Sequence, residues 1–100
     1  MDMEERYRLI MGTIFNAIGC RVKVEQMIST GRIDMVVETT NIIYVLELKL
    51  SNNGGLYAAE KQIKTNQYTE PFKADKRRVI ALAVELDDKG KGLVDWKEVQ

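Results

Sequence analysis

The sequence predicts an α/β domain with a mixed central sheet, formed in the order αβββαβ and followed by a short last strand. Residues 31–50 form two apolar runs joined by a polar turn, and both runs are apolar on both alternating faces. Such strands are typical of the middle of a sheet that is covered on both sides. Apolar residues recur at helical spacing over 3–18 and 57–66, and a further doubly apolar strand follows at 79–86. A helix between two strands is the usual connection of a parallel pair, so we expect 79–86 to lie parallel to a central strand.

Length and composition restrict the class of protein. A chain of 100 residues is long enough for one core, so residues 1–100 are predicted to be a single domain. The formal net charge is zero, which argues against a domain that holds nucleic acid by charge alone. One cysteine and no histidine exclude a disulfide within the chain, a Cys/His zinc site and histidine-based catalysis. No apolar run reaches membrane-spanning length, and we expect a cytoplasmic protein.

The first helix is predicted over 3–18, with Asp2 as its N-cap and Gly19 as its stop signal. Its spacing predicts one buried apolar stripe made of Tyr7, Ile10, Met11, Ile14, Phe15 and Ile18. Glu4 lies at the edge of this stripe, where a helix-terminus charge is the simplest interpretation.

Residues 21–28 are predicted to form the first strand, near an edge of the sheet, with Glu25 as a surface charge. Ser29 to Gly31 forms the turn that follows. Gly31 is predicted to supply an unusual backbone angle or a close approach to another segment.

Three charged residues interrupt the apolar hairpin: Asp34 in the strand 33–38, and Glu47 and Lys49 in the strand that ends at Leu50. The period of two places Glu47 and Lys49 on one face, and the hairpin places Asp34 beside them. Buried charges are costly unless they are paired, hydrogen-bonded or bound to a metal. An exposed ion pair on a half-buried sheet is the structural alternative. Carboxylate oxygens are also the ligands that Mg²⁺ and Mn²⁺ prefer, which makes this group a candidate metal site.

The second helix, 57–66, is predicted to pack on the sheet through Leu56, Ala59 and Ile63. Gln62 lies near the inner edge of this helix, where an ordinary surface glutamine is the alternative. Tyr68 follows, either as a core residue or as a neighbour of a bound phosphate.

The last third of the chain is predicted to contain the buried strand 79–86, a polar turn at 87–92 and a short strand at 93–99. Trp96 is expected to anchor that last strand. Residues 73–78 hold the one basic cluster, which is either a surface for a polyanion or a solvated loop.

An acid-x-Lys pattern occurs three times, at 47–49, 87–89 and 95–97, but only the first lies inside an apolar strand with another acid one strand upstream. The combination of Gly31-Arg32-Ile33-Asp34, a hairpin and Glu47-Leu48-Lys49 resembles the core of the PD-(D/E)XK nuclease superfamily.

The wider pattern is similar to the small nuclease domain found at the C-terminal end of bacterial AAA-ATPase-like proteins. The positions that carry this resemblance are Glu4, Tyr7, Gly31 to Asp34, Glu47 to Leu50, Gln62-Ile63, Tyr68 and Asp95-Trp96-Lys97. The resemblance implies a restriction-endonuclease-like core.

The resemblance also implies a set of site residues. Asp34, Glu47, the backbone carbonyl of Leu48 and an acid from the first helix would hold Mg²⁺ or Mn²⁺. That acid is Glu4, with Glu5 as the alternative one residue away.

The same resemblance gives the remaining roles. Lys49 would position the attacking water and stabilise charge, and Gln62 would orient Lys49 or a phosphate, so that Asp34, Glu47, Lys49 and Gln62 form the catalytic set. Arg32 and Tyr68 would contact the substrate.

Two functions follow. The first is a metal-dependent nuclease that hydrolyses phosphodiester bonds of nucleic acid. The second is a catalytically inactive module that keeps the fold and binds or oligomerises, with a second copy of the chain or the ATPase region of a longer protein as its partner.

Overall fold

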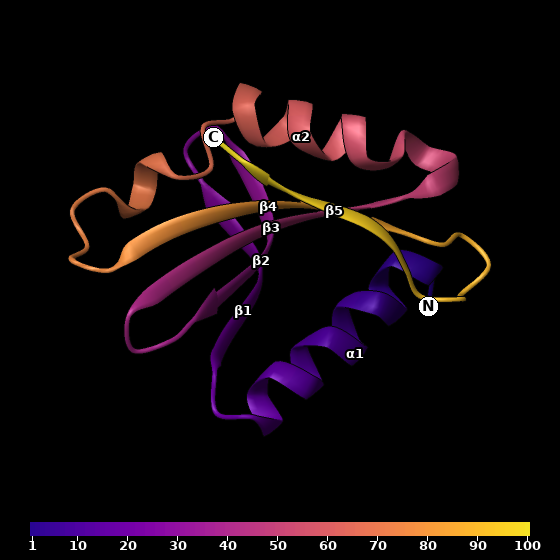
Figure 1. The fold of residues 1–100 in the computed structure, drawn as a ribbon, viewed down its shortest axis with the longest axis horizontal. Coiled ribbons are helices and arrows are strands. Elements are labelled where there is room, and N and C mark those ends of the chain that lie inside the picture. The colour runs from indigo at the N-terminus through magenta and orange to yellow at the C-terminus, as the bar shows by residue number, and fades with distance from the viewer.

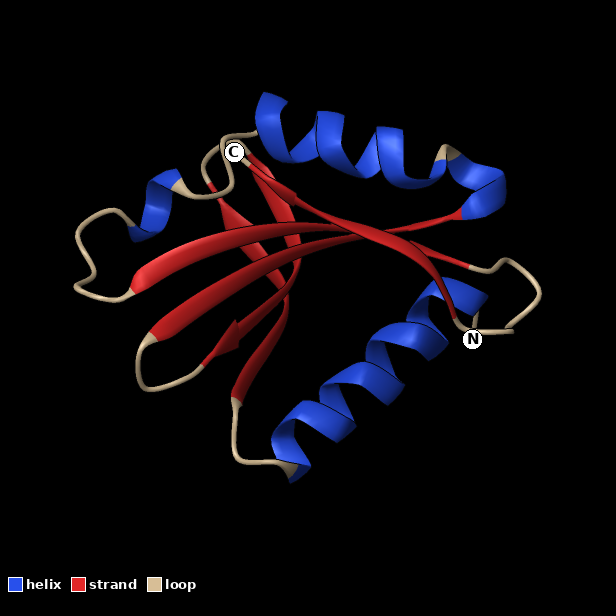
Figure 2. Ribbon diagram, viewed as in Figure 1, coloured by secondary structure: helices blue, strands red, loops and turns tan.

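The computed structural model describes residues 1–100, which form one five-stranded sheet with a helix on each face (Figures 1 and 2). The elements in chain order are α1 (Met3–Ala17), β1 (Arg21–Ile28), β2 (Gly31–Glu38), β3 (Ile42–Leu50), a 3₁₀ turn (Ser51–Asn53), α2 (Gly55–Thr65), a second 3₁₀ turn (Glu70–Phe72), β4 (Arg78–Leu86) and β5 (Leu93–Val99). The predicted order of helices and strands is confirmed. None of the helices has the length and apolar character needed to span a membrane.

The strands lie in the sheet in the order of the chain, β1-β2-β3-β4-β5. β1, β2 and β3 pair antiparallel, β4 pairs parallel with β3, and β5 pairs antiparallel with β4. The chain reaches the parallel strand through α2, as the helical segment between two buried strands predicts. β3 and β4 are therefore the centre of the sheet and are covered on both faces.

Each face of the sheet has its own core. The core under α2 consists of Ile33, Val36, Ile43, Val45, Ala59, Ile63, Tyr68, Ala81, Ala83 and Val99. The core under α1 consists of Tyr7, Met35, Val37, Leu46, Leu48, Val84 and Leu86. Successive residues of β3 from Ile43 to Leu46 point alternately into the two cores, which explains why this part of the strand is apolar on both faces.

The start of α1 is fixed by a capping box. The Glu5 backbone N–H donates to Asp2 Oδ1 at 2.8 Å, and the Asp2 backbone N–H donates to Glu5 Oε2 at 3.3 Å. Reciprocal bonds of this kind satisfy two N–H groups that a helix terminus otherwise leaves free. Asp2 is the N-cap, as predicted.

The predicted buried stripe of α1 is wrong on one flank. Ile10 and Ile14 are each 54 % exposed and Ile18 is 70 % exposed, whereas Tyr7 and Gly12 are buried. The helix packs mainly on β1, β2 and β3, so its contact face is narrower than the apolar stripe. One flank of the stripe therefore remains in solvent.

Trp96 does not anchor β5, because its side chain is 59 % exposed. It pairs across the sheet with Val84, which belongs to the core under α1, but Trp96 lies on the edge strand and is not part of that core. Val99, on the α2 face, is the residue of β5 that enters a core.

Candidate active site

The sheet opens where β2 leaves β3, and this opening places Asp34. The last paired residues of the two strands are Met35 and Leu46, so the ladder stops one residue before Asp34 and Glu47. The Leu48 backbone N–H donates to Asp34 Oδ2 at 2.8 Å instead of to a strand carbonyl. Asp34 is only 4 % exposed, and this bond holds its carboxylate against β3.

Glu47 and Lys49 lie on the same face of β3, as the period of two predicts. Lys49 Nζ is 3.6 Å from Glu47 Oε2. Glu47 is 2 % exposed, so the pair is not the exposed surface ion pair that was the structural alternative. The lysine side chain is 20 % exposed, which leaves its ammonium at the boundary between core and solvent.

Tyr68 fixes the other oxygen of Glu47. Its buried hydroxyl oxygen lies 2.6 Å from Glu47 Oε1 and 2.8 Å from the Arg32 carbonyl oxygen, and Gln62 Nε2 donates to it at 2.8 Å. The structure thus selects the core alternative for Tyr68, since its hydroxyl faces Glu47 and not open solvent. Gln62 likewise contacts Tyr68 in place of the expected Lys49.

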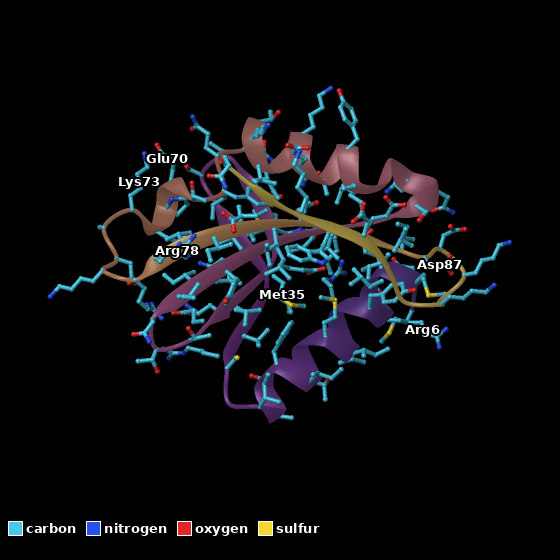
Figure 3. The ribbon with its side chains drawn as sticks, viewed as in Figure 1. Arg6, Met35, Glu70, Lys73, Arg78 and Asp87 are labelled. Atoms are coloured by element: carbon cyan, nitrogen blue, oxygen red, sulfur yellow. The ribbon has the colours of Figure 1, made fainter.

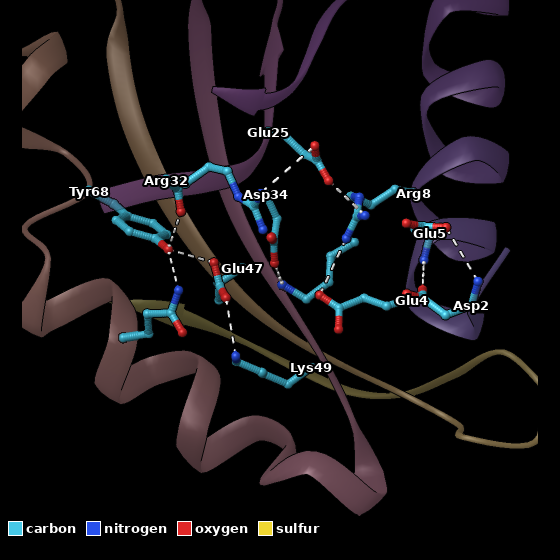
Figure 4. Close-up of polar contacts among 12 residues, drawn as sticks. Asp2, Glu4, Glu5, Arg8, Glu25, Arg32, Asp34, Glu47, Lys49 and Tyr68 are labelled. Carbon is cyan, nitrogen blue, oxygen red and sulfur yellow. Dashed lines mark hydrogen bonds and ion pairs between the residues drawn. The ribbon is translucent and has the colours of Figure 1, made fainter. Parts of the chain in front are cut away.

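Glu4 turns toward the same place from the other side of the sheet opening (Figure 4). Burial, together with the charge of Asp34, raises its pKa above the usual value. Glu5 is engaged in the capping box of α1 and is exposed, so the alternative one residue along the helix is excluded. The first helix therefore supplies Glu4 to the site.

The electrostatics of Glu47 are unfavourable to a second negative charge. Burial and the nearby Asp34 raise its pKa to about 8, against the opposing effects of the Tyr68 hydroxyl and the Lys49 ammonium. Burial and the hydrogen bond with Glu47 raise the pKa of Tyr68, which keeps its hydroxyl neutral. That hydroxyl carries one proton and faces two oxygens, so a proton on Glu47 completes the hydrogen bonding. A pKa of about 8 favours the protonated form of Glu47 at neutral pH.

These side chains surround a pocket of about 430 Å³ that is open to solvent. Its lining is Glu4, Met27, Gly31, Arg32, Asp34, Glu47, Lys49 and Gln62. All predicted site side chains except Tyr68, which is buried in the core under α2, are brought together here; Leu48 was predicted through its backbone carbonyl. A pocket that combines buried acids with a lysine is an arrangement typical of hydrolytic sites.

Comparison with known proteins agrees with this geometry. The sequence pattern of the PD-(D/E)XK nuclease superfamily matches residues 2–96. The chain belongs to the PD-(D/E)XK nuclease superfamily. The match covers α1 through most of β5 and therefore includes every residue of the pocket.

A second comparison places this superfamily member beside a longer protein. The chain is 29 % identical over 93 residues to "Uncharacterized protein in vnfD 5'region" from Azotobacter chroococcum mcd 1. The aligned part is 93 % of this chain but only 18 % of that relative. No solved structure matches the chain.

PD-(D/E)XK nucleases usually use divalent cations, and the donors of this pocket suit a hard one. Asp34, Glu47 and Glu4 offer carboxylate oxygens, although no three such side chains are gathered closely enough to enclose a metal by themselves. Mg²⁺ is commonly held by one or two carboxylates while it keeps several waters, and an open pocket allows this. A cation would also relieve the repulsion that keeps a proton on Glu47.

Two residues beside the pocket escaped the sequence-based prediction. Arg8 connects Glu4, at 3.4 Å, with Glu25, at 2.9 Å, and Arg32 lies 3.9 Å from the same Glu25. Arg8 follows Glu4 by four residues, which is a spacing that favours an ion pair on a helix. Glu25 is exposed, as a surface charge should be, but its contacts with Arg8 and Arg32 were not predicted.

Gly31 does make the predicted close approach. A Cβ atom at this position would lie 2.9 Å from Asn66 Nδ2. The turn between β1 and β2 therefore packs against the end of α2 at Asn66, and Gly31 itself lines the pocket.

The basic cluster at 73–78 does not extend the site. Lys73 pairs with Glu70 at 2.6 Å, and Arg77 pairs with Asp75 and Glu38. Arg78 begins β4 beside Ile42, at the opposite end of β3 from Lys49 (Figure 3). The solvated-loop alternative describes this cluster, because Lys73 and Arg77 are paired locally and the cluster lies far from the pocket.

Proposed function

We propose that this chain is a nuclease that uses Mg²⁺ or Mn²⁺ to hydrolyse phosphodiester bonds of nucleic acid. The observation that carries the proposal is the pair of buried acids, Asp34 and Glu47, beside Lys49 in an open pocket. Two adjacent buried carboxyl groups weaken the fold, and apolar residues of similar size would stabilise it better. Pairs of this kind cluster at functional sites.

Asp34, Glu47, Glu4 and the backbone carbonyl of Leu48 are the groups proposed to hold the cation. A divalent cation supplies positive charge that stabilises phosphoryl oxygens and eases the deprotonation of water. The Leu48 N–H keeps Asp34 turned toward β3, and Tyr68 keeps Glu47 in place. Both carboxyl groups are thus oriented before any ligand arrives, which lowers the cost of reorganisation.

Lys49 is the proposed catalytic lysine. Its ammonium at the pocket wall would position the attacking water and stabilise the negative charge that develops on the phosphoryl group. Gln62 acts indirectly, since it donates to Tyr68, which in turn contacts Glu47; we assign it as a positioning residue. Arg32, half exposed at the rim, is proposed to contact the substrate.

The experiment that tests this function is cleavage of labelled single- and double-stranded DNA and RNA in Mg²⁺ or Mn²⁺. Lys49→Ala should abolish cleavage while metal binding persists. Lys89→Ala is the matched control, because it removes the lysine of a second acid-x-Lys pattern in the exposed turn between β4 and β5. Full activity in Lys49→Ala would refute the proposed role of this lysine.

A specific observation also favours the second function, an assembly module. Leu9, Ile10, Ile14 and Ile18 are exposed on α1, an unusual concentration of aliphatic residues for a helix that faces solvent. A homodimer, or an ATPase region attached in a longer protein, would cover them. Mass measurement in solution tests the homodimer. A dimer that dissociates in Ile14→Glu supports self-association, and a monomer at all concentrations contradicts it.

We propose that residues 1–100 act as one domain in the cytoplasm, where the single thiol, Cys20, would stay reduced. The alignment covers only 18 % of the longer relative, which supports the proposal that this domain functions as part of a larger protein. Because this domain has zero net charge, another part of such a larger protein would supply most of the affinity for nucleic acid.

A further inference from the structure

We propose that Arg8 and Arg32 form a phosphate subsite beside the candidate metal site, and that the Glu25 carboxylate occupies this subsite until substrate displaces it. The identity of the displacing ligand, a nucleic-acid phosphate, rests on the proposed nuclease function. The subsite itself rests on the contacts of three side chains, which Figure 4 shows converging between α1 and the β1–β2 hairpin.

The contacts place one carboxylate between two guanidinium groups. Arg8 Nη2 lies 2.9 Å from Glu25 Oε1, and Arg32 Nη1 lies 3.9 Å from Glu25 Oε2. The planar fork of a guanidinium fits a carboxylate and a phosphate equally well. Glu25 therefore stands where a phosphate oxygen would bind.

The subsite adjoins the pocket directly. Arg32 lines the pocket wall, and the second nitrogen of Arg8 contacts Glu4, which also lines it. The Arg8 side chain is only 11 % exposed and is held in place from both sides, whereas Glu25 is 43 % exposed and can turn away. An anion bound between the two arginines would be a neighbour of a phosphate bound at Asp34 and Glu47. Successive phosphates of one nucleic-acid strand are neighbours in the same way.

The backbone at Glu25 is strained. Its φ of 51° lies in the left-handed region, which is unfavourable for a residue other than glycine. The next residue adds a second cost, because Gln26 Oε1 is buried without a hydrogen-bond partner. Two costs in consecutive residues accompany the placement of the Glu25 carboxylate between the arginines.

Structural stabilisation does not account for this arrangement. Ion pairs between partly exposed side chains contribute little to stability, and one of the two contacts is as long as 3.9 Å. That gain is smaller than the combined cost of the strain and the unpaired oxygen. A functional role does account for it. The Glu25 carboxylate keeps the two arginines in position and competes with weakly binding anions, so only a ligand that binds more tightly displaces it.

The test compares Glu25→Gln with Glu70→Gln. Glu70 is a matched control, because it is 47 % exposed, is paired with Lys73 and lies away from the pocket, so both substitutions remove the same charge from a surface ion pair. Inorganic phosphate is titrated while the arginine side-chain N–H signals are followed by NMR. Glu25→Gly is a second variant that removes the carboxylate and suits the positive φ.

We expect both Glu25 variants to bind inorganic phosphate about fivefold or more tightly than the wild type, with shifts of the Arg8 and Arg32 signals. We expect Glu70→Gln to behave as wild type. The affinity of Glu25→Gln for a labelled oligonucleotide should also rise, with a salt dependence steeper by about one ion. Adding Arg32→Ala to Glu25→Gln should remove the gain.

Equal phosphate binding by Glu25→Gln, Glu25→Gly and Glu70→Gln would overturn the inference. The phosphate titration requires no cleavage, so the two proposals fail separately. Tighter phosphate binding without any nuclease activity would support the subsite and refute the nuclease. Nuclease activity with phosphate binding unchanged would do the reverse.

Discussion

Glutamine in place of Glu47 should stabilise the metal-free domain at neutral pH. The substitution keeps the shape of a side chain that is 2 % exposed and removes its charge. A glutamine can still accept a hydrogen bond from Tyr68 and can donate one to Asp34. The amide cannot ionise, so Asp34 never faces a second negative charge at position 47.

The magnitude follows from the pKa of Glu47, which burial and Asp34 raise from 4.5 to about 8 in the folded domain. A carboxyl group with a raised pKa binds its proton more tightly in the folded state, so its contribution is complete below about pH 4.5 and is lost as pH rises toward 8. Between pH 4.5 and pH 7, an interval of about 2.5 pH units, the free energy of unfolding of the wild type falls by roughly 3 kcal/mol, at 1.36 kcal/mol per unit. The Glu47→Gln variant lacks this loss.

The assay is urea unfolding of both proteins in EDTA from pH 5 to pH 8.5. The stability of wild type should fall across this range relative to Glu47→Gln. Glu85→Gln is the control with the opposite behaviour, because hydrogen bonds from Ser51 and the Leu56 backbone lower the pKa of Glu85. Its stabilisation is present above the usual pKa and is lost only in more acidic solution, so Glu85→Gln should be less stable throughout. Parallel pH profiles for wild type and Glu47→Gln would refute the electrostatic argument.

Two further predictions concern the same network. Tyr68→Phe should destabilise the domain by about 1–2 kcal/mol in urea unfolding, because it deprives Glu47 and Gln62 of a buried hydrogen-bond partner; unchanged stability would contradict this. Mn²⁺ binding should tighten from pH 6 to pH 8, because Glu47 must lose its proton to become a ligand. Calorimetry in buffers of different ionisation enthalpy should show release of about one proton at pH 7, and no release would show that Glu47 is ionised beforehand.

The centre of the fold and most of the pocket could be predicted from the sequence. Apolar runs on both faces specify buried strands, and the period of two then fixes Glu47 and Lys49 on one face without any tertiary information. The hairpin turn then predicts which residue of the neighbouring strand lies beside Glu47, and this prediction is accurate enough to identify Asp34. Local rules suffice here because the strands are long and the turns are short.

What the sequence did not reveal depends on how elements meet. The apolar spacing of α1 does not say which flank touches the sheet, and Ile10 and Ile14 stay exposed because they lie outside the face that packs on the strands. Trp96 is exposed because an edge strand has a neighbour on one side. The placement of Glu25 depends on a positive φ, which alternation cannot predict.

The most direct test of the account is calorimetric titration of Mn²⁺ and Mg²⁺ into wild type, Asp34→Ala and Asp88→Ala, each with and without an oligonucleotide. Asp88 lies in the polar turn after β4, so its loss removes an acid outside the pocket. We predict metal binding by wild type and Asp88→Ala that disappears in Asp34→Ala. Binding by Asp34→Ala equal to that of wild type, or no binding by wild type even with the oligonucleotide present, would contradict a metal site at Asp34 and Glu47.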